Sequence, residues 1–241
     1  LAGSISDPAG NLGPLYETTV ISRILDTVVP VVSWGVSPTT PTNQNSTFQV
    51  NFSESVSGFS SSSLRNAGTA GSCVFTVSTI SAGYQYSVTV SSCTDGTLIP
   101  EVIANSVSDG AGNLGPATNP SADRLAGAIQ VDMSAPVASF TTQPPSRSRG
   151  TLTYVLHFNE PIITTQGSPA SLENTDFVFS GSAAGCLISI TPIANSNDYT
   201  VVLTSCGEGS LTLQLIDDAV TDLIGNTGQL AIFANTTIDN T

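Results

Sequence analysis

Hydrophobic and polar residues alternate over several short stretches of this chain. Residues 48–52 and 154–158 place an aromatic or aliphatic side chain at every second position, which is the period of a β-strand with one buried face. No stretch shows helical periodicity of useful length. Further strands are indicated for residues 73–80, 86–93, 96–106, 126–132, 186–190, 199–203, 209–220 and 230–239.

The pattern recurs along the chain, and the phrase Asp-x-x-Gly-Asn marks the recurrence. Asp109 and Asp222 lie 113 residues apart, and the four cysteines repeat with the same step. Such a fixed period is the signature of a repeat architecture. The phrase occurs in SDPAGNLGP (6–14), SDGAGNLGP (108–116) and TDLIGNTGQ (221–229).

Upstream of the cysteines the step is shorter. Residues 26–34 match residues 132–140 at a step of 106, so we expect a seven-residue insertion in the second copy, within residues 163–176. The steps divide the chain into the tail of a preceding repeat (1–25), two complete repeats (26–131 and 132–238) and the start of the next linker (239–241).

Each complete repeat holds about seven predicted strands in a hundred-odd residues. This number predicts an all-β fold of tandem immunoglobulin-like β-sandwiches in an extended array. Trp34 and Phe140 occupy the same position of the repeat. A place in the core is favoured over a binding role for both.

Composition and charge narrow the choice of function. All five basic residues are Arg, and 18 acidic residues bring the net charge to −13. A chain this acidic is not expected to bind nucleic acid, whereas clustered carboxylates would suit a cation. No apolar run approaches the roughly 18 residues of a membrane span, so we expect no membrane insertion in this segment. No signal or anchor pattern is recognised, so the chain reads as part of a longer protein.

Several short phrases carry a family resemblance. They are FSESVSGF and FNEPI, a Tyr-x-Val-x-Val strand before a cysteine, DGT and EGS, ANSVSDGAGNLGP, and an Asp-x-x-x-Pro linker. In this order they resemble the tandem bacterial immunoglobulin-like repeats of long secreted and cell-surface proteins and adhesins, and the cysteine-containing form is most similar to actinobacterial repeats. The resemblance covers essentially the whole chain, although residues 15–24 and the degenerate TDLIGN depart from it. It implies an extracellular stalk or spacer, often stiffened by calcium.

The cysteines are placed for pairing within each repeat. Cys73 and Cys93 lie at equal distances from the turn of a predicted hairpin, in a symmetric register in which Ile80 and Tyr86 flank the turn. Cys186 and Cys206 are placed in the same way. Facing residues on antiparallel strands lie about 4.5–5.5 Å apart at Cα, within disulfide range. Metal ligation, which favours shorter spacings, and free buried thiols are the alternatives. Two intradomain disulfides would indicate an oxidising, extracellular setting.

Strand order predicts a convergence of carboxylates. In a seven-stranded sandwich the linker, the B–C loop and the F–G loop share one end, so each repeat brings three acidic residues to the seam with the preceding module. Such a seam, with its loop carbonyls, suits Ca²⁺, which takes six to eight oxygen ligands. The two sets are Asp26, Glu54 and Asp109, with Asn113 in the same F–G loop, and Asp132, Glu160 and Asp222, with Asn226 in the same F–G loop.

The same phrase also has a purely structural interpretation. Asp favours Asx-turns and Gly-Asn accepts left-handed backbone, so Asp-x-x-Gly-Asn is good turn chemistry without a metal. Glu54 and Glu160 could equally cap a loop. Asp7 belongs to a module that is not complete in this chain, so we expect no complete site there.

Little in the sequence indicates catalysis. His157 replaces Asn51 of the first copy on the outward register of a strand, which favours an exposed histidine. No GxSxG, HExxH or glycine-rich phosphate loop occurs. Paired carboxylates at Asp217 and Asp218 or at the seams would otherwise be the candidates for glycoside hydrolysis.

We therefore expect a non-catalytic structural repeat at the cell surface, an adhesin stalk or fibre body whose partners are its neighbouring repeats. A self-assembling filament or sheath, and a module that binds a glycan or protein on a host surface, are the alternatives. For a binder, the candidate contacts are Tyr84, Tyr86 and Tyr199 near the hairpin turns and the basic segment 146–149. Possible N-glycosylation sites are Asn45, Asn51 and Asn235.

Overall fold

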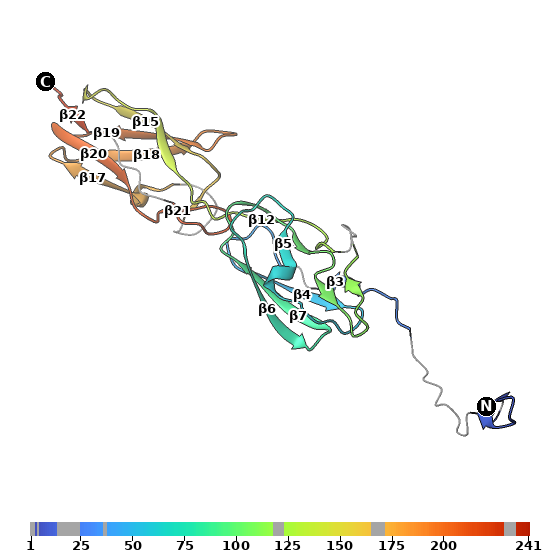
Figure 1. The fold of residues 1–241 in the computed structure, drawn as a ribbon. Helices are drawn as coiled ribbons and strands as arrows, with labels where there is room; N and C mark the ends of the chain where they lie inside the picture. Colours follow the sequence, from blue (N-terminus) through green and yellow to red (C-terminus); the bar gives the residue numbers. More distant parts are fainter. Residues whose placement is uncertain are drawn as a thin grey trace.

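The computed structural model describes residue 3 and residues 5–13, 25–35, 38–117, 123–164, 172–228 and 235–241. Within these residues the chain is almost wholly β, with two short 3-10 helices, η1 (Ser61–Ser63) and η2 (Asn174–Asp176). The strands form two β-sandwiches that lie end to end (Figure 1).

The first sandwich has a four-stranded antiparallel sheet in the order β3–β4–β7–β6. Two antiparallel pairs, β5–β9 and β8–β12, cover the other side of its core. In chain order, one sheet holds strands A, B, D and E and the other holds C, F and G, which is the immunoglobulin arrangement. The bounds are β3 (Val32–Trp34), β4 (Ser46–Phe52), β5 (Leu64–Asn66), β6 (Val74–Ser81), β7 (Gln85–Ser91), β8 (Gly96–Leu98), β9 (Pro100–Val102) and β12 (Ile129–Val131).

The second sandwich repeats this plan. One sheet has the order β13–β15–β19–β18 and the other β14–β22–β20–β17. The predicted all-β fold of tandem immunoglobulin-like sandwiches is confirmed. The bounds are β13 (Ala138–Thr142), β14 (Arg147–Ser148), β15 (Leu152–Phe158), β17 (Phe177–Gly181), β18 (Leu187–Pro192), β19 (Asp198–Thr204), β20 (Gly209–Leu215) and β22 (Thr236–Ile238).

Short strand pairs flank the Asp-x-x-Gly-Asn phrases and fix the loops in which they lie. In the second sandwich the paired strand comes from the B–C connection, so it links two of the loops that meet at the seam. The pairs are β1 (Ile5–Ser6) with β2 (Leu12–Gly13), β10 (Val107–Ser108) with β11 (Leu114–Gly115), and β16 (Ile163–Thr164) with β21 (Val220–Thr221).

Each sandwich encloses its own hydrophobic core. The alternation predicted for β4 and β15 is confirmed, because their inward side chains are all buried: Phe48, Val50, Phe52, Tyr154, Leu156 and Phe158. Trp34 packs edge-on against Phe48 with ring centroids 6.1 Å apart. Phe140 packs against the second core at the equivalent place, so both aromatic residues contribute to packing, as predicted.

The hairpin register differs by one residue from the symmetric register that the cysteine spacing suggests. Along β6 and β7, Phe75 lies opposite Val90, and Ile80 forms a β-bulge near the turn. Ser92, beyond the other end, takes a positive φ of 57° and restores the symmetric alignment at the cysteines. Ser205 does the same in the second hairpin with a φ of 58°. The predicted symmetric register is therefore wrong along the strands of the first hairpin. Ile80 is one extra residue on β6 and Ser92 is one extra residue after β7, so the two shifts cancel and the cysteines still face each other.

Some predictions about the division of the chain are not resolved by this fold. The strands of the two cores lie between Val32 and Val131 and between Ala138 and Ile238. The unit boundaries 26–131 and 132–238 themselves stay a prediction. Part of the expected insertion, residues 165–171, and part of the preceding tail, residues 1, 2, 4 and 14–24, lie outside the described residues.

Candidate metal centres

The linker before each sandwich is fastened to the B–C loop. The Val31 N–H donates to Ser53 Oγ at 2.9 Å, and the Ser53 N–H donates back to the Val31 carbonyl at 2.9 Å. Val137 and Asn159 make the matching pair of contacts in the second sandwich, at 2.7 and 3.2 Å. In both sandwiches the next residue of the B–C loop is the predicted glutamate, so these contacts hold it beside the linker.

The Asp-x-x-Gly-Asn phrase folds as a capped turn. Asp109 Oδ1 accepts the backbone N–H groups of the residues two, three and four positions later, at 2.7–2.8 Å. Gly112 has a φ of 96°, which glycine adopts without steric cost. Asp7 and Asp222 accept backbone N–H groups in the same way at the head of their own turns. The turn interpretation is therefore correct for the backbone, and it explains why Asp and Gly recur.

The asparagine of the phrase has a role that sequence reasoning missed. Asn113 Nδ2 donates to Asp109 Oδ2 at 2.8 Å and to the backbone carbonyl of Asp26 at 3.1 Å. Asn226 makes the matching contacts in the second sandwich, at 2.7 and 2.9 Å. The F–G loop thereby holds the main chain of the linker aspartate in both sandwiches.

These contacts bring the six predicted carboxylates together in the predicted groups. We call Asp26, Glu54 and Asp109 the first carboxylate set, and Asp132, Glu160 and Asp222 the second carboxylate set. In each set the three residues place one carboxylate oxygen each within 4.8 Å of the others. Asp109 and Asp222 are only 7% and 3% exposed.

Both glutamates are held in an unfavourable electrostatic environment. Burial raises the pKa of Glu54, and the charges of Asp109 and Asp26 raise it further. Burial likewise raises the pKa of Glu160, and the charges of Asp132 and Asp222 add to this effect. Both pKa shifts indicate that the three negative charges of each set repel one another.

Asp109 responds in the opposite direction. Its burial acts to raise the pKa, but the hydrogen bonds from Asn113 and from the loop N–H groups outweigh burial and hold the pKa below its ordinary value. The loop therefore stabilises the ionised form of Asp109 next to a glutamate whose pKa is raised.

The donor set fits a hard divalent cation. All three side-chain donors in each set are carboxylate oxygens, which are the ligands that Ca²⁺ and Mg²⁺ prefer. The burial of one aspartate in each set removes water that would otherwise screen the repulsion. Loop carbonyls and water would have to supply the remaining ligands that calcium requires. Cation binding itself stays a prediction.

A fourth carboxylate at the second set was not predicted. Asp95, in the turn before β8 of the first sandwich, accepts hydrogen bonds from the Met133 N–H at 2.5 Å and from the Ser134 hydroxyl. Its charge also contributes to the raised pKa of Glu160. The second carboxylate set therefore lies at a seam to which both sandwiches contribute.

The predicted cysteine partners are confirmed. Cys73 bonds to Cys93 and Cys186 to Cys206, with Cα atoms 4.1 Å apart in both pairs. Each bridge joins the two strands of a hairpin and closes a sequence separation of 20 residues. The alternatives of metal ligation and free thiols are thereby eliminated for all four cysteines.

The other candidate residues for binding or catalysis belong to neither carboxylate set. His157 Nδ1 lies 2.6 Å from Asp198 Oδ1 on the adjacent strand, with 44% of its side chain exposed, so the expected exposed strand position is confirmed. Tyr86 and Tyr199 are buried, whereas Tyr84 is 49% exposed.

The remaining candidates lie on the surface or partly within it. Asn45 and Asn235 are exposed, and half-buried Asn51 accepts a hydrogen bond from Gln85 Nε2 at 2.8 Å. Glycosylation of these three asparagines stays a prediction. Asp217 and Asp218 are also exposed. So are the two arginines of segment 146–149, Arg147 and Arg149.

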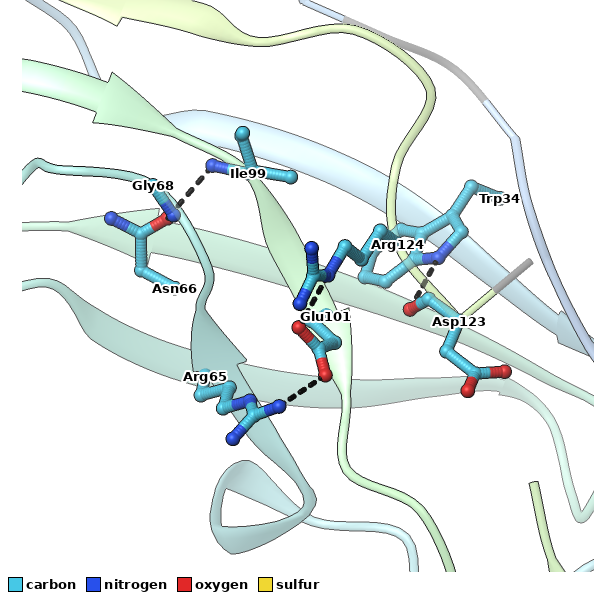
Figure 2. A network of polar contacts seen from close by, with 8 residues as sticks. All are labelled: Trp34, Arg65, Asn66, Gly68, Ile99, Glu101, Asp123 and Arg124. Carbon is cyan, nitrogen blue, oxygen red and sulfur yellow. Dashed lines mark hydrogen bonds and ion pairs between the residues drawn. The ribbon is translucent and has the colours of Figure 1, made fainter. Parts of the chain in front are cut away.

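A buried ion-pair network distinguishes the first sandwich (Figure 2). Glu101 is 6% exposed and binds Arg65 at 2.5 Å through Oε1 and Arg124 at 2.6 Å through Oε2. Burial acts to raise the pKa of Glu101, but the two guanidinium groups outweigh it and the pKa lies below its ordinary value. In the second sandwich the matching cross-strand pair is Val178 and Gln214, so the network is not part of the repeat.

The similarity of this chain to known proteins is weak. No family model matches the chain, and no curated protein matches it significantly. Among solved structures, the chain is similar to the crystal structure of invasin, a bacterial integrin-binding protein, with 14% identity and a TM-score of 0.38. The match covers 87% of this chain and 40% of the invasin chain. Among the described residues, no helix is long and apolar enough to cross a membrane.

Proposed function

We propose that this chain is a non-catalytic structural segment of a long extracellular surface protein, an adhesin stalk or fibre body. Intradomain disulfides and calcium at the seams between sandwiches would stiffen it. Its partners would be the neighbouring repeats of the same chain, with other copies or host-surface ligands engaged elsewhere. The observation that carries the proposal is the convergence of three carboxylates at the leading end of both sandwiches.

The proposal follows from the electrostatic repulsion that arises when three carboxylates are brought together. Three like charges within 4.8 Å of one another repel, as the raised pKa values of Glu54 and Glu160 indicate. Each set draws one residue from the linker, one from the B–C loop and one from the F–G loop. A divalent cation would turn the repulsion into attraction and join the three segments. The linker would then lose its freedom to bend relative to the sandwich that follows it.

Calorimetric melting of the full chain in chelator and in calcium tests this function. A ligand that binds only the folded state stabilises it by about 2.7 kcal/mol at 100 times Kd, so we expect the melting temperature to rise by about 10 °C or more. Titration calorimetry should give two Ca²⁺ per chain. Mg²⁺ should stabilise less, because it demands a tighter octahedral geometry.

The matched control is the double variant Glu54→Gln with Glu160→Gln. It retains the fold-forming contacts of both loops but loses one charge from each set, so calcium should no longer raise its melting temperature. Equal melting of the wild-type chain in chelator and in calcium, with no heat of binding, would remove the calcium stiffening from the proposal.

A self-assembling filament is a second candidate, and the edge strands favour it. β6 and β18 are the outer strands of their sheets, and Val74, Ile80 and Leu187 are 51%, 55% and 63% exposed on or beside them. The hairpin 73–93 contains no charged residue, and unprotected edges of this kind can pair with other chains. Sedimentation velocity over a range of concentrations separates a monomeric stalk from a chain that associates laterally.

A further inference from the structure

The Asp95 side chain suggests a link between the two sandwiches that the carboxylate sets alone do not show. We propose that Asp95 is a positioning residue for the second carboxylate set, so that cation binding at the second set depends on the docking of the first sandwich. This inference rests on the calcium sites of the proposed function and adds a residue from a different sandwich to one of them.

Asp95 holds the linker immediately after the first residue of the second set. Both of its carboxylate oxygens are used, one by the Met133 N–H at 2.5 Å and the other by the Ser134 hydroxyl. The Ser134 N–H in turn donates to Asp132 Oδ1 at 3.2 Å. Asp95 therefore controls the conformation of the turn that aims the Asp132 carboxylate.

The main chain of Asp132 is held from both sandwiches. Its N–H donates to the Thr42 carbonyl of the first sandwich at 3.1 Å, and its carbonyl accepts from Asn226 Nδ2 of the second at 2.9 Å. Asn226 Oδ1 accepts a hydrogen bond from Asn43 Nδ2 of the first sandwich at 3.1 Å. Four contacts from the first sandwich, through Thr42, Asn43 and both oxygens of Asp95, thus define the position of the second set.

The first carboxylate set lacks such an arrangement within the described part of the chain. There, Asp26 is held by the Val28 N–H at 3.0 Å and by Asn113 Nδ2 at 3.1 Å, both from residues that follow it. The two sets therefore have carboxylates at equivalent positions of the repeat, but only the second is held by a preceding sandwich within the described residues. The first set can therefore serve as an internal reference for the second.

The trailing end of the second sandwich offers a matched control residue. The Asp239 N–H donates to the Ser148 carbonyl at 3.0 Å, as that of Asp132 does to Thr42. Glu208 occupies the repeat position of Asp95, 113 residues later, and its side chain is exposed. We therefore expect removal of the Glu208 charge to change neither carboxylate set.

Calcium titration of the full chain in two backgrounds tests the inference. Glu54→Gln leaves the second set as the binding site, and Glu160→Gln leaves the first. Substitution of a residue that orients a ligand typically lowers metal affinity 10–100-fold. We expect Asp95→Asn to weaken calcium binding about tenfold or more in the Glu54→Gln background, and to change nothing in the Glu160→Gln background. Glu208→Gln should change nothing in either.

Two uncharged variants separate positioning from loss of charge. Ser134→Ala removes one hydrogen bond to Asp95, and Asn43→Ala removes the contact with Asn226, without altering the net charge. Both should weaken the second set several-fold and leave the first unaffected. If only Asp95→Asn has an effect, Asp95 acts through its field and the positioning role is wrong.

Failure of this inference and failure of the proposed function give different results. A wild-type chain that binds no calcium overturns both. A wild-type chain that binds two ions, while Asp95→Asn leaves the affinity of the second set unchanged, overturns only the inference. Melting in chelator should be nearly the same for Asp95→Asn and wild type, because neither hydrophobic core is altered.

Discussion

In the first carboxylate set the pKa values of Asp109 and Glu54 shift in opposite directions, although their carboxylates lie within 4.8 Å of each other. Hydrogen bonds from the F–G loop keep the pKa of Asp109 low, while burial and the two aspartates raise the pKa of Glu54. The glutamate is therefore the residue that bears the repulsion when no cation is present, and substitution there reports most directly on metal binding.

Glu54→Gln is expected to have opposite effects in chelator and in calcium. In chelator the melting temperature should rise by no more than a few degrees, because the amide removes a charge that its neighbours repel. A raised folded pKa means that this penalty is present at neutral pH and disappears as pH falls below the ordinary value of 4.5, so the two proteins should converge there. In calcium the variant should lose the stabilisation of the first set. A variant that melts below wild type in chelator at pH 7 would contradict the electrostatic account.

Glu101 should show the opposite pH dependence. Its pKa is lowered by Arg65 and Arg124, so its stabilising contribution is present above the ordinary value of 4.5 and is lost as pH falls through the folded pKa. We expect Glu101→Gln to cost about 1–3 kcal/mol at pH 7, less than a fully buried pair because both arginines are partly exposed. Chemical denaturation of both proteins between pH 3 and pH 7, roughly the range over which a carboxyl titrates, should show the difference shrinking toward acid. Gln214 of the second sandwich is the matched control site, and Gln214→Ala should show no such pH dependence.

Sequence patterns could place the six carboxylates and the asparagine of the phrase at one end of each sandwich, but not the contacts that position them. Asp26, Glu54 and Asp109 follow from strand order, because alternating strands return their loops to the same end of a sandwich. Asp95 and Asn113 act through backbone groups of the linker, and no spacing rule links a side chain to a distant N–H or carbonyl. The one sequence signal for Asp95 was that the triplet DGT, which begins at Asp95, recurs as EGS at Glu208.

At the level of the hairpin, the cysteine pairing was predictable and the strand register was not. The equal distances from the turn correctly pair Cys73 with Cys93. Between them, the bulge at Ile80 and the left-handed Ser92 shift the strands in opposite directions. Neither irregularity has a sequence signature, since serine and isoleucine both occur in regular strands. Pairs of such irregularities cancel at the ends and leave the cysteines aligned.

Removal of one disulfide should destabilise one sandwich and spare the other. Each bridge closes a separation of 20 residues, for which the chain-entropy model gives about 3 kcal/mol. We expect the double variant Cys73→Ala with Cys93→Ala to lower the melting temperature of the first sandwich by about 10 °C or more, which calorimetry would resolve as a separate transition. The reciprocal double variant, Cys186→Ala with Cys206→Ala, is the control. A simultaneous shift of both transitions would show that the two sandwiches unfold as one unit.

At the scale of the whole molecule, the repeat predicts two similar sandwiches in series, as Figure 1 shows. It does not predict how they meet. The seam depends on Asn43 and Asp95 of one unit and Asn226 of the other. In the next copy, Arg149 occupies the repeat position of Asn43 and Glu208 occupies that of Asp95. The residues that form contacts between sandwiches differ between the two copies, whereas the core pattern is kept. The contacts between sandwiches stabilise one relative orientation and not the fold of either sandwich.

The seam should be loosened selectively by Asn226→Ala. This change removes hydrogen bonds to Asp222, to the Asp132 carbonyl and to Asn43 of the preceding sandwich, each worth about 0.5–1.5 kcal/mol. Small-angle scattering in chelator should show a broader distribution of overall dimensions than for the wild-type chain. Asn113→Ala is the control, since Asn113 makes the equivalent contacts with Asp109 and the Asp26 carbonyl ahead of the first sandwich and its loss leaves the seam between the two sandwiches intact. Identical scattering from wild type and both variants would mean that these side chains do not set the angle between the sandwiches. In that case the short linker alone would have to set this angle when no calcium is bound.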